Sequence, residues 1–208
     1  MLISLENLSQ KYQFKAKGIV HLGAHLAEEL EDYLKHGAQN ILWVDGNPKI
    51  FNLLCQKTSR HAGSRCVQAI LSNQDNEEWL FRITNNGESS SILELKDHKK
   101  EHPTIYVQES VRVKTITYDS LVQKEKIDCR LYDFLSLDLQ GAELMSLEGM
   151  KETLKFFSYL YLEVNLKEIY KGCALKSQID EFLASRGFIH HESKILEHGW
   201  GDAFYMKK

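Results

Sequence analysis

Two short apolar stretches, Gly18-Ile-Val-His-Leu-Gly23 and Ile41-Leu-Trp-Val-Asp45, decide the fold, because each has the length of a buried strand and ends at a turn residue. Between them, residues 25–36 place apolar side chains at helical spacing, and Gly37 follows as a stop. A strand, a helix and a second strand in this order predict parallel strands with helices packed on the faces of the sheet.

The same alternation continues towards the end of the chain. Further strands are predicted at 65–70, 134–138 and 157–164, and further helices at 48–60, 142–153 and 175–186. Residues 78–84 and 106–117 alternate apolar and polar side chains, which predicts an antiparallel insertion at about 76–118. Residues 188–192 and 203–207 predict a closing antiparallel pair. We therefore expect one α/β Rossmann-like domain over 18–208, preceded by a helical lead-in at 1–17.

The composition is that of an ordinary soluble globular protein, with 43% hydrophobic and 26% charged residues in 208. A net charge of -3 argues against a broad nucleic-acid surface, which usually needs a basic domain. No apolar run is long enough to span a bilayer, and the four cysteines show no C-x-x-C spacing. We expect a cytoplasmic protein that binds neither nucleic acid nor membrane; the oligomeric state stays open.

The turn after the first strand is the first candidate ligand site. Gly23 and Ala24 lead towards a helix N-terminus, where free N–H groups and a positive dipole favour carboxylates or phosphates. Asp45 ends the second strand about 20 residues later, which is where Rossmann-like folds place an acid that binds ribose hydroxyls. The dinucleotide pattern G-x-G-x-x-G would need glycines where His25 and Glu28 stand, so a nicotinamide-dependent oxidoreductase is disfavoured.

Acidic residues mark the ends of two later strands. Asp138 follows a buried strand at the edge of the sheet where ligands bind in open α/β folds. Glu143 follows in the first turn of the next predicted helix. The alternative interpretation is structural, because an acidic side chain at a helix N-terminus stabilises the helix. Glu163 lies near the end of the following strand. We predict catalytic candidates at Asp138, Glu143 and Glu163, with Asp138 preferred as the base that takes a proton from an acceptor and His25 as a further candidate.

Five segments occur in one order along the chain: Val20-His-Leu-Gly-Ala-His-Leu-Ala-Glu-Glu29, Asp45-Gly-Asn-Pro48, Ser89-Ser-Ser-Ile-Leu93, Lys114-Thr-Ile-Thr-Tyr-Asp-Ser-Leu121 and Asp133-Phe-Leu-Ser-Leu-Asp-Leu-Gln-Gly-Ala-Glu-Leu144. Together they resemble the FkbM family of S-adenosylmethionine (SAM)-dependent methyltransferases. The chain departs from the family's usual pattern at Ala27, Asp45 and Ser136, where glycine, glutamate and lysine are common.

The resemblance implies a seven-stranded class I methyltransferase fold with SAM as cofactor. It further implies cofactor contacts along the first, second, third and fourth parallel strands, at Gly23, Ala24, His25, Glu28, Asp45, Gly46, Asn47, Ala69, Ile70, Ser72 and Asp138. Family members usually methylate hydroxyl oxygens, often on saccharides or secondary metabolites. Ser89 and Ser90, in the insertion, are the residues we expect to hydrogen-bond a small-molecule or saccharide acceptor.

Three alternatives remain beside O-methylation. A non-catalytic SAM- or nucleotide-binding module would use the same binding residues, and the oxidoreductase is weaker still. Methylation of nucleic acid lacks an N-P-P-Y-like tetrapeptide. No metal site is expected, because His190 and His191 are adjacent in a predicted strand and would point to opposite faces.

Overall fold

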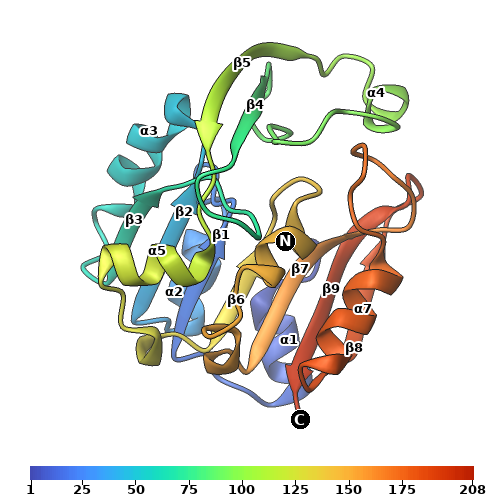
Figure 1. Ribbon diagram of the computed structural model, residues 1–208. Coiled ribbons are helices and arrows are strands. Elements are labelled where there is room, and N and C mark those ends of the chain that lie inside the picture. The colour runs from blue at the N-terminus through green and yellow to red at the C-terminus, as the bar shows by residue number, and fades with distance from the viewer.

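The computed structural model describes residues 1–208 and is built around a seven-stranded sheet of order β3-β2-β1-β6-β7-β9-β8 (Figure 1). The first five of these strands in sheet order run parallel, and β9 and β8 are antiparallel additions at one edge. The strands are β1 (Gly18–Leu22), β2 (Asn40–Asp45), β3 (Ser64–Gln68), β6 (Phe134–Leu137), β7 (Tyr159–Asn165), β8 (Phe188–Ile195) and β9 (Trp200–Lys207). The predicted mostly parallel Rossmann-like sheet with a C-terminal antiparallel pair is confirmed.

Both faces of the sheet are covered by helices, so successive side chains of the central strands enter two different cores. In β1, Val20 and Leu22 pack with α5 (Tyr118–Glu125), α6 (Glu143–Glu148) and α7 (Lys176–Ser185). Ile19, from the same strand, packs on the other face with α1 (Leu5–Tyr12), α2 (Leu30–His36) and α3 (Pro48–Thr58). The continuous apolar runs of the sequence follow from this double burial.

The insertion forms a separate two-stranded ribbon above the sheet, made of β4 (Glu78–Thr84) and β5 (Val107–Lys114) in antiparallel register. The segment between them, residues 85–106, carries the short helix α4 (His98–Glu101) and is called the lid below. Apolar lid and ribbon side chains such as Phe81 and Leu93 pack against Ile169 and Tyr170, which follow β7. This third core holds the lid over the carboxyl ends of the strands (Figure 1).

Two helix predictions were wrong in their bounds. The helix predicted at 25–36 begins only at Leu30, because His25 and Ala27 have positive φ angles of 41° and 50° that a helix cannot contain. The helix predicted at 142–153 ends at Glu148, and Asp119 then accepts the backbone N–H groups of the following turn at residues 152 and 153. Helices α4 and α5 were not predicted.

The longest helix, α3, has 11 residues, and no helix combines the length and the apolar character needed to cross a membrane.

Candidate active site

A cavity of about 460 Å³ lies at the carboxyl ends of the parallel strands, beneath the lid. Its walls include residues that directly follow β1, β2, β3 and β6. The strand order reverses direction between β1 and β6, and open α/β sheets bind their ligands at such a switch point. The size also falls within the range of ligand-binding clefts.

The turn after β1 is fixed against its neighbours by its backbone. Gly23 has φ +81°, and a Cβ at this position would lie 1.7 Å from the carbonyl oxygen of Asp138. The N–H groups of Gly23 and Ala24 both donate to the carbonyl of Val44, at 2.8 and 3.1 Å. Glycine is therefore required here, because the turn lies directly against the end of β6.

Asp45 connects the ends of β1 and β2. Its Oδ2 accepts the N–H of His25 at 2.8 Å and its Oδ1 accepts the N–H of Asn47 at 2.7 Å. Burial raises the pKa of the Asp45 carboxyl, and these two backbone hydrogen bonds oppose the rise. The sequence predicts free N–H donors at a helix N-terminus here. The structure instead has a turn in which the N–H groups of Gly23 and Ala24 donate to Val44 and that of His25 donates to Asp45.

Asn47 brings an unpartnered donor to the same wall. Its side chain is 2% exposed and its Oδ1 accepts the N–H of Lys49, but its Nδ2 has no hydrogen-bond partner in the protein. Because buried polar groups are nearly always paired, this amide indicates a ligand that accepts a hydrogen bond beside Asp45.

The remaining cofactor predictions divide into residues that line the cavity and one that does not. Gly46, Ala69 and Ile70 lie along the wall past β2 and β3, together with Leu71. Ser72 is fully buried outside the cavity, where its hydroxyl donates to Asn73. Leu71 was not singled out from the sequence, although it directly precedes Ser72.

His25 and Glu28 both line the cavity and pair with each other, with His25 Nδ1 2.9 Å from Glu28 Oε1. This hydrogen bond raises the pKa of His25, while partial burial opposes the rise. The chain has a left-handed conformation at His25, and Gly23, Ala24, His25 and Glu28 line one wall of the cavity.

Asp138, Glu143 and Glu163 bring one carboxylate oxygen each to within 4.8 Å of the others. Desolvation raises the pKa of all three: Asp138 to about 6, Glu143 to about 7, and Glu163 well above its usual range. Like charges at this distance cannot all ionise together, so the cluster titrates as a unit and Asp138 ionises first.

The three carboxylates have different surroundings. Asp138 and Glu163 line the cavity, whereas Glu143 lies behind it, 1% exposed. Glu143 Oε1 accepts the N–H groups of Leu139 at 2.8 Å and Gly141 at 3.0 Å, so this carboxylate holds the loop after β6. Of the three predicted catalytic acids, only the two that line the cavity can reach a ligand there.

Gln140 lies between the two cavity acids, a contact that the sequence did not reveal. Its Nε2 donates to Asp138 Oδ1 at 2.6 Å and to Glu163 Oε2 at 3.1 Å, and its Oε1 accepts the hydroxyl of Tyr170. The hydrogen bond to Asp138 opposes the desolvation that raises its pKa. Oxygen donors of this kind also suit a divalent cation, but an amide already bridges two of them here. The absence of a metal stays a prediction.

The lid closes the cavity from above. Ser89 and Ser90, for which we expect acceptor contacts, both line the cavity. They also hold the lid turn: Ser90 Oγ donates to the carbonyl of Gly87 at 2.7 Å, and Ser89 Oγ accepts from Asn86 at 3.1 Å. Ser91 Oγ donates to the carbonyl of Gln140 at 2.8 Å, which fastens the lid to the loop after β6.

His98 is a lining residue that the sequence did not indicate. Its side chain is 6% exposed, its Nδ1 is fully buried without a hydrogen-bond partner, and its ring lies 5.5 Å from that of Tyr170. His102 also lines the cavity, one helical turn later. A pair of histidines four residues apart was the available signal, but it stood in a charged stretch without apolar periodicity.

The Methyltransferase FkbM domain family matches residues 16–189. The chain belongs to the FkbM methyltransferase family. The predicted family and its cofactor SAM are confirmed.

Individual proteins match this chain over a shorter segment or at lower sequence identity. The 2-O-methyltransferase NoeI of Sinorhizobium fredii is 29% identical over 98 residues, a match that covers 47% of this chain and 37% of NoeI. A SAM-dependent methyltransferase from Aquifex aeolicus superposes with a TM-score of 0.52 at 10% identity, covering 98% of this chain and 89% of that one. The ribosomal protein L11 methylase of Lactobacillus delbrueckii subsp. bulgaricus also reaches 0.52, at 7% identity, covering 99% and 76%. These structures share the fold.

The residues around the cavity fit SAM. A ribose needs a carboxylate that accepts hydrogen bonds from its hydroxyls. Asp45 lines the cavity, and each of its oxygens accepts only one backbone N–H, so both can accept a further hydrogen bond. The orphaned amide of Asn47 supplies a donor next to it. The apolar wall at Ala69, Ile70 and Leu71 suits the face of an adenine.

Proposed function

We propose that this methyltransferase methylates a hydroxyl oxygen of a small acceptor, a saccharide or a secondary metabolite. One observation carries the proposal: the cavity joins the nucleoside wall at Asp45 to a second region under the lid, where Asp138 and Glu163 face inwards. A hydroxyl must lose its proton as the methyl group arrives, and a carboxylate beside it can take that proton. The match to a 2-O-methyltransferase supports the same chemistry.

In this proposal Gly23, Ala24, His25 and Glu28 hold the amino-acid part of SAM, and Asp45 holds the ribose. The adenine lies along Gly46, Asn47, Ala69 and Ile70. SAM supplies a methyl group that is already electrophilic because it is bonded to a positively charged sulfur. The protein therefore has to orient the acceptor, exclude water and receive one proton.

Asp138 is the base that the surroundings favour. Its pKa of about 6 leaves it ionised at pH 7.5, and still basic enough to take a proton. Burial raises the pKa of Glu163 well above its usual range, and repulsion by the charges of Asp138 and Glu143 raises it further. Glu163 therefore keeps its proton and can donate a hydrogen bond to the acceptor. Glu143 acts only by holding the loop that carries Asp138.

The lid completes the acceptor site. Ser89 and Ser90 contribute hydroxyl groups, and the lid covers the reacting atoms from solvent. We propose that neither nucleic acid nor a membrane is the substrate, because the cavity lies beneath the lid and a polymer would have to displace the contact between Ser91 and Gln140.

The test is transfer of tritiated methyl from SAM to a panel of saccharides and hydroxylated aromatic compounds, with the product position read by mass spectrometry and NMR. We expect O-methylation of at least one panel member. Asp138→Asn should retain binding of S-adenosylhomocysteine and lose turnover by about 100-fold or more, within the range of general-base catalysis. Glu152→Gln, at an exposed acid away from the cavity, should retain both binding and turnover. Methylation of nitrogen alone, or full turnover in Asp138→Asn, would contradict the proposal.

A further inference from the structure

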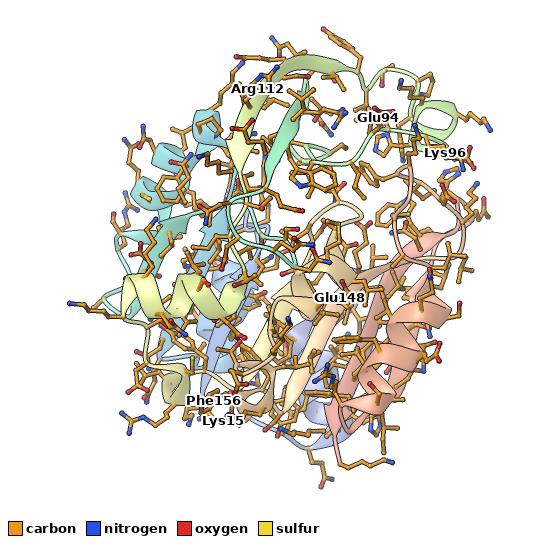
Figure 2. All side chains as sticks on the ribbon, in the orientation of Figure 1. Lys15, Glu94, Lys96, Arg112, Glu148 and Phe156 are labelled. Carbon is orange, nitrogen blue, oxygen red and sulfur yellow. The ribbon has the colours of Figure 1, made fainter.

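The cavity is rich in carboxylates and contains no permanent cation. Its lining includes no lysine or arginine, and its acids are Glu28, Glu29, Asp45, Glu88, Asp138 and Glu163. The basic side chains of the lid lie elsewhere: Lys96 pairs with Glu168 at 2.8 Å, and Figure 2 shows Lys96 and Glu94 beside α4 at the edge of the molecule. Glu28 pairs with His25, Glu29 pairs with the N-terminal ammonium at 2.9 Å, and Glu163 keeps its proton, so the negative charge that a ligand meets comes from the other three acids.

Three of the four lining histidines do not offset this charge. Burial lowers the pKa of His21 and of His98, and His102 lowers that of His98 further, so both rings are neutral at pH 7. His25 is more basic, but its ring already pairs with Glu28 at 2.9 Å. SAM brings a positive sulfonium, which suits such surroundings. An acceptor with a phosphate, sulfate or carboxylate group would lose its hydration and find no lysine or arginine in the lining to replace it.

The acceptor side of the cavity is built for hydroxyl groups and for ring faces. Tyr170 and Trp200 supply aromatic surface, and Ile105 and Ile169 supply apolar contacts. His98 Nδ1 is buried and unpartnered, so it needs a hydrogen-bond partner that the protein does not supply. A hydroxyl group can meet the neutral ring as donor or as acceptor, and it can donate to Asp138.

We propose that the cavity selects a hydroxylated acceptor that carries no anionic group, and that His98 hydrogen-bonds one of its hydroxyls. This inference rests on the proposed O-methylation and narrows its substrate class. The expected discrimination is large. One negative charge about 6 Å from a carboxylate, at an effective dielectric constant of about 20, weakens binding by roughly 100-fold.

The experiment compares matched acceptors in the tritiated-methyl assay: methyl glycosides of neutral hexoses, the corresponding hexose 6-phosphates and the corresponding hexuronic acids. We expect kcat/KM for neutral glycosides to exceed that for the anionic partners by about 100-fold. Equal or faster transfer to the phosphates or uronates would overturn the inference while leaving O-methylation intact. Transfer to none of these hydroxylated probes, with S-adenosylhomocysteine still bound in calorimetry, would overturn the proposed function and this inference with it.

Variants at two lining residues test where the selectivity arises. Ile105→Lys places a cation on the acceptor side and should raise the phosphate-to-neutral ratio of kcat/KM at least 10-fold, whereas Ile105→Met, a matched apolar control, should leave the ratio unchanged. His98→Ala should raise KM for the neutral glycoside about 10-fold, and His98→Gln, which keeps a donor and an acceptor, should recover most of that loss. A ratio that does not respond to Ile105→Lys, or equal KM values for both His98 variants, would contradict the assignment.

Discussion

Replacing Gly23 by alanine tests the close packing of the first turn against β6. The new Cβ would lie 1.7 Å from the carbonyl oxygen of Asp138, and the backbone would have to keep a φ of +81°. Gly187 offers a matched control, because its φ is +83° and a Cβ there meets nothing within 4 Å. The two substitutions therefore share the conformational strain and differ in the steric clash.

The magnitudes follow from these two geometries. A non-glycine residue in the left-handed region costs about 1–2 kcal/mol, partly offset by about 0.4–1 kcal/mol from a less flexible unfolded chain. Gly187→Ala should thus lose about 1 kcal/mol of unfolding free energy. Gly23→Ala adds overpacking of about 1–3 kcal/mol, because a backbone atom and not a flexible side chain has to move. For a chain of this size each kcal/mol lowers Tm by about 2–4 °C.

Thermal unfolding and calorimetry together read out the result. We expect Tm to fall by about 5–15 °C in Gly23→Ala and by less than about 5 °C in Gly187→Ala, with affinity for S-adenosylhomocysteine reduced at least about 10-fold only in Gly23→Ala. Equal losses of Tm in the two variants, or unaltered affinity in Gly23→Ala, would refute the reasoning that this turn lies against β6 and shapes the cofactor wall.

Substitutions at three carboxylates give further predictions. Asp45→Ala should weaken SAM binding in calorimetry by about 100-fold or more, since hydrogen bonds to a charged acceptor contribute about 1.5–3 kcal/mol each. Asp45→Glu keeps a carboxylate and should keep most of the affinity. Equal losses of affinity in the two variants would contradict ribose binding by this carboxylate. The pKa of Asp138 is raised to about 6 in the folded state, so between about pH 4 and pH 6 the folded state keeps a proton that the unfolded state releases. The unfolding free energy of the wild type should therefore fall relative to that of Asp138→Asn as pH rises from about 4 to about 6, and then level off. Urea denaturation across this range measures the difference, and a rise would reverse the assigned sign. Glu143→Leu leaves the N–H groups of Leu139 and Gly141 unpaired, so its unfolding free energy should be about 2 kcal/mol or more below that of Glu143→Gln, which keeps an acceptor. Retained stability in the leucine variant would contradict the role of Glu143 in holding this loop.

The sheet could be predicted from the sequence because its strands are buried on both faces. Runs such as Gly18–Leu22 and Phe134–Leu137 are mostly apolar and end at turn residues, and the predicted bounds of the five parallel strands differ from the observed ones by at most two residues. The antiparallel strands β8 and β9 were each predicted three residues too short, at 188–192 and 203–207. Helix starts were less accurate because non-glycine residues, His25 and Ala27, adopt left-handed conformations in the first turn. Nothing in the local composition signals this, since the hydrogen bond from the His25 N–H to Asp45 that accompanies it comes from another strand.

The candidate site was predictable wherever it follows the strand ends. Gly23, Asp45 and Asp138 were found because a parallel sheet brings its carboxyl ends together. The lid side was not, since α4 has four residues and no apolar periodicity, and its position over the cavity depends on the third core around Tyr170. The bridge made by Gln140 was equally hidden, because a glutamine between two acids has no sequence signature.

Calorimetric titration of the purified protein with SAM, S-adenosylhomocysteine and NAD tests the central assignment most directly. The cavity at the ends of β1, β2 and β6 should bind SAM and S-adenosylhomocysteine with one site per chain, and NAD should give no heat of binding because the dinucleotide glycines are absent. Binding of NAD in place of SAM, or binding of neither SAM nor S-adenosylhomocysteine, would contradict the assignment of this cavity as the methyl-donor site.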